Sequence, residues 1–252
     1  MRDELSSEII TDPDGEPIVE LEGYDALGLQ YAMTLEERAA GEKQWRFGHV
    51  IVDEAQDLTP MQWRMIARRA RGHSMTIVGD VAQRSSDERA TWTELLPEEL
   101  GDVERFDLGI NYRSPSEVAD VAGRVLSEVA PDLTAPAAIR SSGHLVERIQ
   151  VAVTPTLSDT CRRVVTRYKT ELPGGRIAIL AEHDMTELAE ELCVAWYSPK
   201  ASKGMEFDGV IVLEPADIID QPGGMSLLYV AVTRSTGSLA IVHTKPLPTC
   251  LA

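Results

Sequence analysis

The sequence has 252 residues, which is enough for one large domain or two of ordinary size. It holds no run of about 18 apolar residues and no apolar stretch after its charged start, which argues against a membrane span and a secretory signal. Acidic residues outnumber basic residues 41 to 24, for a net charge of −17. Because phosphate contacts supply most non-specific affinity, we expect this chain alone to bind free nucleic acid weakly.

The cysteine pattern indicates a reduced, cytoplasmic protein. There are three cysteines, far apart in the chain. Their number and spacing fit neither a zinc site nor a disulfide framework. They are Cys161, Cys193 and Cys250.

Residues 1–44 form a distinct acidic segment, with twelve acids against three bases. Asp12-Pro13-Asp14-Gly15 is typical of a turn. Thr34 followed by Glu37 resembles a capping box, which predicts a short helix that ends near Gly41. We expect the segment to be a surface-exposed approach to the core.

Residues 45–135 predict a strand, a helix and a second strand. The apolar run Val50–Val52 ends in Asp53-Glu54, and Met75–Val78 ends in Gly79-Asp80. Strands that close on acids are typical of a buried parallel sheet, in which ligands collect at the carboxyl ends. The helix between them is predicted over 60–71. Its apolar side is predicted to comprise Met61, Met65, Ile66 and Ala70.

A second α/β set is predicted after a hinge. Ser114–Ala130 has the pattern of a helix, and prolines and small residues place the hinge at 136–143. Strands are then predicted over 145–153, 176–181, 210–213 and 239–243, and helices over 158–172, 185–196 and 225–233. The expected division is therefore an acidic approach, a first domain over 45–135, the hinge, and a second domain over 144–252.

The pentapeptide Asp53-Glu54-Ala55-Gln56-Asp57 is the strongest chemical signal. Two adjacent carboxylates at the end of an apolar strand suit a magnesium nucleotide site: Asp53 holds Mg²⁺ through water, and Glu54 accepts a proton from the attacking water. A bare Asp-Glu pair is more often a solvated strand end. The whole pentapeptide after an apolar strand favours the nucleotide site.

Five motifs in a fixed order resemble those of UvrD/Rep-type superfamily 1 helicase-like ATPases. After the pentapeptide, which resembles the Walker B motif, come four further motifs. They are Gly79-Asp80-Val81-Ala82-Gln83, Asn111-Tyr112-Arg113-Ser114-Pro115, Lys203-Gly204-Met205-Glu206-Phe207-Asp208 and Tyr229-Val230-Ala231-Val232-Thr233-Arg234. The resemblance implies two RecA-like parallel-sheet units, the first incomplete, that bind ATP and Mg²⁺.

The same resemblance assigns roles to single residues. It implies that Gln83 senses the γ-phosphate and that Arg113 reaches it. Gly204 and Glu206 lie by the nucleotide, with the glutamate near the ribose. Arg234 acts as an arginine finger, a role that is worth about 10³–10⁵ in rate. For a lone arginine, a surface ion pair is the ordinary alternative.

The sequence also departs from the family. It contains no Gly-x-x-x-x-Gly-Lys-Ser/Thr loop, which cradles the β-phosphate, so we expect the C-terminal part of a longer protein, inactive alone. Arg84-Ser85-Ser86 replaces an aromatic that often stacks a base. Lys200 stands where many relatives have histidine. Trp92 is either a substitute stacking platform or a core residue.

Three functions remain open. The block Leu58–Met65 and the preceding Trp45 and Gly48-His49 resemble the HelD branch, which implies an ATPase that remodels RNA polymerase complexes. The first alternative is a DNA helicase or translocase, and the second is a non-catalytic partner-binding fragment. For the ATPase, we predict that Asp53, Glu54, Gln83, Arg113, Glu206 and Arg234 face one cleft.

Overall fold

The computed structural model describes residues 10–11, 17–18, 46–84, 90–152 and 156–252. By its contacts the chain divides into two units. One comprises Met1–Val50 with Arg68–Ser74, and the other comprises Ile51–Ala67 with Met75–Ala252. All residues that were predicted to form the nucleotide site lie in the second unit.

The first unit has little regular structure among its described residues. β1 (Ile10–Thr11) pairs antiparallel with β2 (Pro17–Ile18). Phe47 forms a parallel bridge to Ala70, just before the 3-10 turn η2 (Arg71–His73). The predicted turn at 12–15 and the predicted capping box at Thr34 lie outside the described residues.

A five-stranded parallel sheet is the centre of the second unit. Its order is β7 (Glu147–Gln150), β11 (Ser235–His243), β10 (Phe207–Leu213), β8 (Ile177–Leu180) and β9 (Ala195–Tyr197). All four pairings are parallel. The central strands are nearly continuous apolar runs, as expected for a sheet that is covered on both faces.

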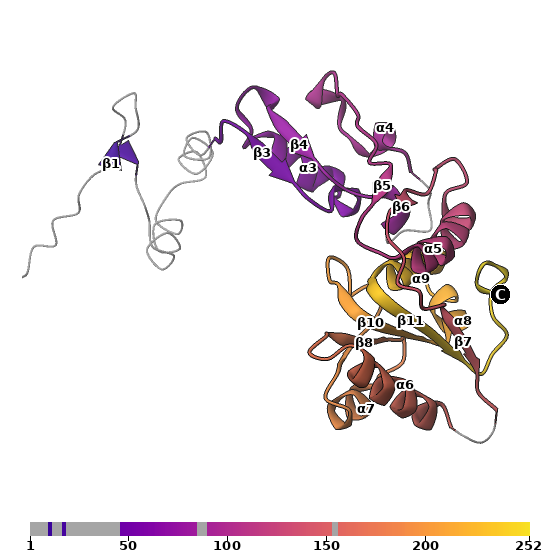
Figure 1. Cartoon of the computed structure of the whole chain (residues 1–252). Helices are drawn as coiled ribbons and strands as arrows, with labels where there is room; N and C mark the ends of the chain where they lie inside the picture. The colour runs from indigo at the N-terminus through magenta and orange to yellow at the C-terminus, as the bar shows by residue number, and fades with distance from the viewer. Residues whose placement is uncertain (1–9, 12–16, 19–45, 85–89, 153–155) are drawn as a thin grey trace, which may run out of the picture. The chain divides into compact units, whose positions relative to one another are not determined.

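Helices cover both faces of this sheet (Figure 1). α6 (Leu157–Glu171) and α7 (Thr186–Glu191) pack on one face. α5 (Ser116–Val129), α8 (Pro215–Ile219), α9 (Gly224–Thr233) and η5 (Thr249–Leu251) cover the other. The alternation along β10 divides the two cores, because Val210 and Val212 face α5 and α9 whereas Ile211 and Leu213 face α6. The predicted α/β fold with a parallel sheet is confirmed.

One predicted helix of this set was partly wrong. The helix expected over 185–196 ends at Glu191, and residues 195–197 form β9 beside β8. Cys193 has a φ of 47°, which interrupts a right-handed helix. The residues that follow, Val194 to Tyr197, are rich in the β-branched and aromatic types that favour strands.

The first α/β set is short. β3 (Val50–Val52) and β4 (Met75–Ile77) form a two-stranded sheet, and α3 (Pro60–Ala67) lies between them in the chain. The predicted apolar side of this helix is only partly buried: Met61 and Met65 are exposed, whereas Ala70, which follows α3, is 3% exposed. The side chain that α3 buries is Trp63, which is 1% exposed. The indole is the largest apolar side chain of the helix, so its burial removes the most surface from water.

Three short helices connect this set to α5. η3 (Val81–Gln83) follows β4 directly. α4 (Trp92–Leu95) and η4 (Glu98–Leu100) come before β5 (Ile110–Asn111). A further 3-10 turn, η1 (Ala55–Asp57), follows β3 and contains most of the acidic pentapeptide.

The predicted hinge at 136–143 is bound to its surroundings. It contains β6 (Ala137–Ala138), which pairs parallel with β5. α5, which precedes the hinge, packs against α9 in the core of the second sheet. The domain division at this hinge therefore stays a prediction. Among the described residues, no helix is long and apolar enough to cross a membrane.

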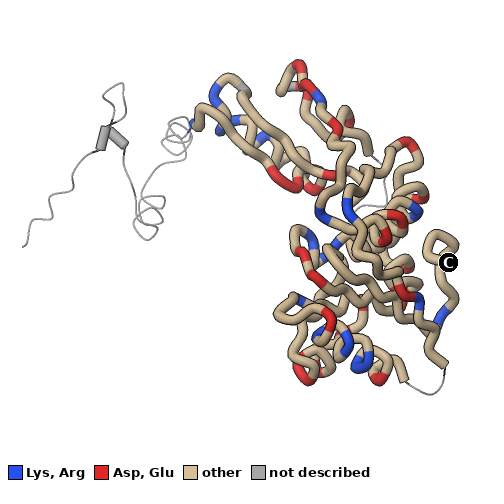
Figure 2. The backbone as a smooth tube through the Cα atoms, in the orientation of Figure 1, with Lys and Arg blue, Asp and Glu red and all other residues tan. Residues whose placement is uncertain are grey.

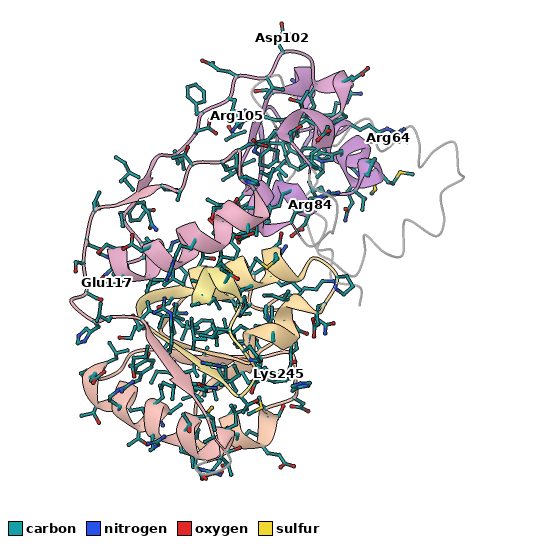
Figure 3. All side chains as sticks on the ribbon, turned by 90° about the vertical axis from the view of Figure 1, so that its right-hand side faces the viewer. Arg64, Arg84, Asp102, Arg105, Glu117 and Lys245 are labelled. Atoms are coloured by element: carbon teal, nitrogen blue, oxygen red, sulfur yellow. The ribbon has the colours of Figure 1, made fainter. Side chains whose placement is uncertain are left out.

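Glu117 fixes the hinge to the first turn of α5 (Figure 3). Its carboxylate accepts the Ser141 hydroxyl at 2.5 Å, the Gly143 N–H at 2.9 Å and the Ser142 N–H at 3.1 Å. The hydrogen bond from Ser141 is the main cause that lowers the pKa of Glu117 from 4.5 to about 2. The charged form is thus the form that the fold favours.

We predict that Glu117→Gln lowers the thermal midpoint at pH 7 and that this difference shrinks in acid. A depressed folded-state pKa gives stability that is present above about 4.5 and lost as the pH falls through about 2. Thermal unfolding followed by circular dichroism between pH 7 and pH 2 measures it. Glu187→Gln makes the same change in the first turn of α7 and serves as the control. A difference that stays constant with pH contradicts the prediction.

An alternating row of apolar side chains leads into α5. Phe106, Leu108, Ile110 and Tyr112 are 77%, 83%, 63% and 71% exposed. Residues at every second position lie on one side of an extended chain. A contiguous exposed apolar patch of this kind favours association.

We predict that the 252-residue chain self-associates and that Phe106→Ser with Leu108→Ser reduces this association. Sedimentation velocity over a range of concentrations measures it. The control is Leu145→Ser, because Leu145 is 84% exposed but lies outside this row. The prediction is wrong if the double variant and the control show the same concentration dependence.

Candidate nucleotide site

Two carboxylates follow β3. The side chain of Asp53 accepts the N–H of Glu54 at 2.8 Å, and Glu54 has a left-handed backbone with φ 50°. The Glu54 carboxylate accepts the side-chain N–H of Gln56 at 2.6 Å. This left-handed conformation, which is uncommon outside glycine, turns the chain sharply at Glu54. The turn leaves Glu54 half-buried beside its exposed neighbour Asp53.

Gln83 and Arg234 meet directly. Gln83 ends η3, whose N-terminus is capped by the Asp80 carboxylate through the Ala82 N–H at 3.0 Å. Arg234 follows the last turn of α9 and is 3% exposed. Its guanidinium donates to the Gln83 Oε1 at 3.0 Å and to the Met205 carbonyl at 3.1 Å. This contact joins the motif Gly79–Gln83 to the motif Tyr229–Arg234.

Arg113 is paired with Glu206 at 2.7 Å. Next to it, the buried Ser114 hydroxyl donates to the Ser235 carbonyl at 3.0 Å. This hydrogen bond therefore joins the residue after Arg113 to Ser235, which is the first residue of β11 and directly follows Arg234. Both arginines are carried on the elements that pack with the second sheet.

Gly204 lies at the edge of the same group. Its φ is 70°, and a Cβ placed on it would be 3.9 Å from the Glu54 Oε1. The adjacent Lys203 forms an ion pair with Asp57 at 2.6 Å. The lysine side chain is 13% exposed and the aspartate side chain 34%, so this pair is better shielded from water than a surface pair.

Burial dominates the electrostatics of Arg234. Desolvation lowers the pKa of its guanidinium, and so does the charge of Arg113. The carboxylates of Glu54, Glu206 and Asp80 act in the opposite direction. These three acids and Arg113 are thus close enough to Arg234 to change its pKa. This agrees with the hydrogen bonds and the ion pair that bring these residues together.

The residues reach the site from opposite strand ends. Glu54 and Gln83 follow β3 and β4, whereas Glu206 and Arg234 directly precede β10 and β11. The rule that ligands collect at carboxyl ends therefore describes only the first pair. The contacts bring together Glu54, Gln83, Arg113, Gly204, Glu206 and Arg234, and Asp53 adjoins them through the N–H of Glu54.

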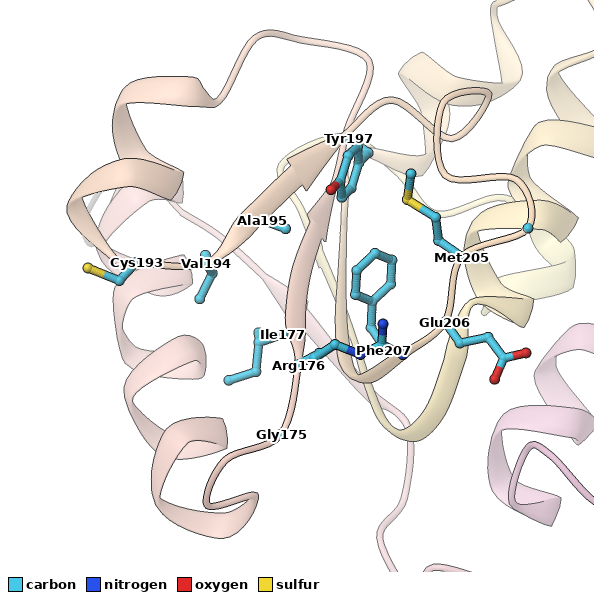
Figure 4. Close-up of a pocket in the computed structure, with 11 residues that line it drawn as sticks. Gly175, Arg176, Ile177, Cys193, Val194, Ala195, Tyr197, Met205, Glu206 and Phe207 are labelled. Atoms are coloured by element: carbon cyan, nitrogen blue, oxygen red, sulfur yellow. The ribbon is translucent and has the colours of Figure 1, made fainter. Parts of the chain in front are cut away.

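Two hollows adjoin this group. The first, of about 620 Å³, includes Gly204 and Glu206 in its lining, and the Tyr197 and Phe207 rings stack inside it with centroids 5.8 Å apart (Figure 4). The second, of about 540 Å³, is lined by Asp57, Arg84, Lys200 and Lys203 among others. The second hollow is thus lined by three basic residues and by the acids Asp57 and Glu94. Acidic residues outnumber basic residues in the chain, and both kinds are spread along the described backbone (Figure 2).

Sequence reasoning missed several contributors. Asp80 lies three residues before Gln83, a spacing typical of a helix N-cap. The pairing of Lys203 with Asp57 had no sequence signal, since the residues are 146 positions apart. Trp92 is half-buried and packs on Gly79, where an added Cβ would be 2.8 Å from the indole. The ring therefore packs against the backbone at Gly79, and a stacking role for it stays a prediction.

The residues present fit a magnesium nucleotide better than a protein-only metal centre. In the described part of the chain, no cluster of three or more His, Cys, Asp or Glu side chains is arranged to hold a metal. Mg²⁺ at nucleotide sites needs only one or two carboxylates, with water and phosphate completing its shell. Asp53 and Glu54 supply that number.

Comparison with known proteins identifies the family. The model described as the viral superfamily 1 RNA helicase core domain matches residues 31–243. The chain belongs to this superfamily 1 helicase core family. Its five-stranded parallel sheet between helices is the architecture of a helicase RecA-like domain.

Relatives of the helicase core are bacterial and much longer. DNA helicase IV of Escherichia coli K12 is 28% identical over 202 residues, 73% of this chain and 28% of the relative. The RecBCD subunit RecB of Mycobacterium tuberculosis is 31% identical over 114 residues, 42% of this chain and 10% of the relative. The chain thus spans less than a third of these relatives. They support the UvrD/Rep-type resemblance but not the HelD branch.

Solved structures give weaker matches. The C-terminal domain of a possible DNA helicase from Lactobacillus plantarum has a TM-score of 0.44 at 20% identity, covering 56% of this chain and 92% of that domain. An arterivirus helicase, nonstructural protein 10, in complex with DNA has a TM-score of 0.46 at 17% identity. The match covers 81% of this chain and 41% of the viral chain.

Proposed function

We propose that this chain is part of an ATP-dependent motor that acts on nucleic acid. The observation that carries the proposal is the contact of Arg234 with Gln83, beside Glu54 and the Arg113–Glu206 pair. Phosphoryl transfer depends on charges and donors placed around the transferring group. Two arginines, a glutamine amide and a carboxylate in one group supply such an arrangement.

Each residue takes a distinct part in this proposal. ATP would supply the phosphoryl group, with Mg²⁺ held at Asp53. Glu54 accepts a proton from the attacking water, and Gln83 orients that water through its amide. Arg113 and Arg234 neutralise charge on the γ-phosphate, while Gly204 and Glu206 line the nucleotide. In the structure Arg113 is paired with Glu206, and Arg234 is bonded to Gln83.

The hollow beside Lys203 supports nucleic acid as the second ligand. Its lining includes Arg84, Lys200 and Lys203 beside the acids Asp57 and Glu94, and Lys203 is paired with Asp57. Basic side chains supply the phosphate contacts that dominate such binding. Lys200 lies between β9 and Gly204. We infer that single-stranded nucleic acid lies here, with DNA the first choice because of the named DNA helicase relative. Cys161, Cys193 and Cys250 form no disulfide, which accords with the proposed location of the protein in the reducing cytoplasm.

In the longer protein that we expect to contain this chain, Glu54→Gln is predicted to remove hydrolysis and keep ATP binding. The exchange keeps size and hydrogen bonding but removes the proton acceptor. Steady-state phosphate release and binding of a fluorescent nucleotide measure the two properties. Glu98→Gln, an acid of η4, is the control. Turnover within a few-fold of the unmodified protein excludes Glu54 as the water-activating residue.

We predict that the 252-residue chain alone has no significant ATPase activity. The sequence lacks the loop of backbone N–H groups, lysine and hydroxyl that holds the β-phosphate and Mg²⁺. Its net charge of −17 adds repulsion toward the nucleotide. Phosphate release is measured with and without single-stranded DNA. Turnover near 1 s⁻¹, about the low end of enzyme rates, that Glu54→Gln abolishes contradicts the prediction.

A second candidate is remodelling of RNA polymerase complexes. Its support is the block Leu58–Met65 and the acidic composition, which suits a protein partner better than free DNA. We predict that the longer protein co-purifies with RNA polymerase at low salt if this candidate is right. No co-purification, together with tight and salt-sensitive DNA binding, selects the DNA motor. If the longer protein neither co-purifies with RNA polymerase nor binds DNA, and has no ATPase activity, the result selects a non-catalytic partner-binding fragment.

A further inference from the structure

The buried side chain of Gln56 has a fixed orientation. It is 1% exposed, and it makes two hydrogen bonds, one as a donor and one as an acceptor. Its Nε2 donates to the Glu54 Oε2 at 2.6 Å, and its Oε1 accepts the backbone N–H of Asp80 at 3.1 Å. Because a backbone N–H only donates and a carboxylate only accepts, the amide fits in one orientation.

Gly79 makes the close approach of Gln56 to Asp80 possible. A Cβ on Gly79 would lie 2.4 Å from the Gln56 Oε1 and 3.2 Å from the backbone N of Ala55. Any side chain at this position would push the amide away from the Asp80 N–H. Gln56 therefore accounts for a glycine at position 79, together with the Trp92 indole, which the same Cβ would approach to 2.8 Å.

Asp80 fixes the orientation of the second amide. Its Oδ2 accepts the Gln83 Nε2 at 3.0 Å, while its Oδ1 accepts the Ala82 N–H. A carboxylate offers no donor, so Gln83 must turn its NH₂ toward Asp80. Its Oε1 then faces away and receives the Arg234 guanidinium at 3.0 Å.

We propose that Gln56 and Asp80 are positioning residues that connect Glu54 to Gln83 and Arg234 through one polar relay. The relay runs from the Glu54 carboxylate through the Gln56 amide to the Asp80 N–H, and from the Asp80 carboxylate through the Gln83 amide to Arg234. Neither positioning residue touches the nucleotide in the proposed site. The catalytic meaning of the relay rests on the proposed function, whereas its existence does not.

The relay is tested first in the 252-residue chain, without nucleotide. In ¹H–¹⁵N spectra, Gln56→Leu is expected to shift the side-chain NH₂ of Gln83 and the Nη–H groups of Arg234, one of which donates to Gln83. Gln62→Leu is the matched control, because the Gln62 amide bonds locally to the Thr59 N–H at 2.8 Å. Unchanged Gln83 and Arg234 resonances in a folded Gln56→Leu variant overturn the relay.

Asp80→Asn provides a second, isosteric variant in case Gln56→Leu does not fold. The amide oxygen introduced by this exchange can still cap η3, but the new NH₂ group offers a donor to Gln83. The Gln83 amide then turns over and loses its hydrogen bond with Arg234. We expect the Arg234 Nη–H resonances to move toward their positions in the Gln83→Ala variant. An Arg234 resonance identical to that of the unmodified chain contradicts the role of Asp80.

The catalytic part is tested in the longer protein. Gln56→Leu is expected to lower kcat by about 10–100-fold, the range for partners that orient a catalytic ligand. The KM for ATP is expected to stay within about two-fold, because an orienting loss acts on the chemical step. An unchanged kcat overturns the catalytic role of Gln56. No hydrolysis by the unmodified protein would refute the proposed function instead, while the spectra would still decide the relay.

Discussion

The hydrogen bond between Arg234 and Gln83 is the contact on which the site depends. It joins the turn after β4 to the residue that separates α9 from β11. Arg234 is nearly inaccessible to solvent, so its charge requires neighbouring acceptors and carboxylates. Its other donors reach the carbonyls of Val230 and Met205. A buried cation held in this way sets the position of the groups around it.

The parallel sheet explains why this arginine can be buried. Its central strands are apolar on both faces, and α9 packs against β10 and β11 with no exposed residue in its last two turns. Arg234 emerges from that rigid helix, and Ser114 bonds to the next residue, Ser235. The spacing of Arg113 and Arg234 is therefore held by the contact of Ser114 with Ser235 beside the core.

Much of this organisation could be predicted from sequence. Apolar runs such as Val210–Leu213 identify buried parallel strands because tertiary packing and local propensity agree there. The boundary of α7 could not be predicted, because Leu188 and Trp196 fit one helical face equally well until the pairing of β9 is known. The contacts were also beyond sequence: Glu206 and Arg234 precede β10 and β11 but bond to Arg113 and Gln83, which follow β5 and β4, and no spacing encodes these pairs.

The central claim is that Gln83 and Arg234 act as one unit on the same phosphate. A double-mutant cycle on ATP turnover in the longer protein tests it most directly, with Gln83→Ala, Arg234→Ala and both together. The account predicts that the double variant is slowed about as much as the more damaging single variant, because either change breaks the unit. Rate losses that multiply in the double variant would show that the two residues act independently and would contradict the account.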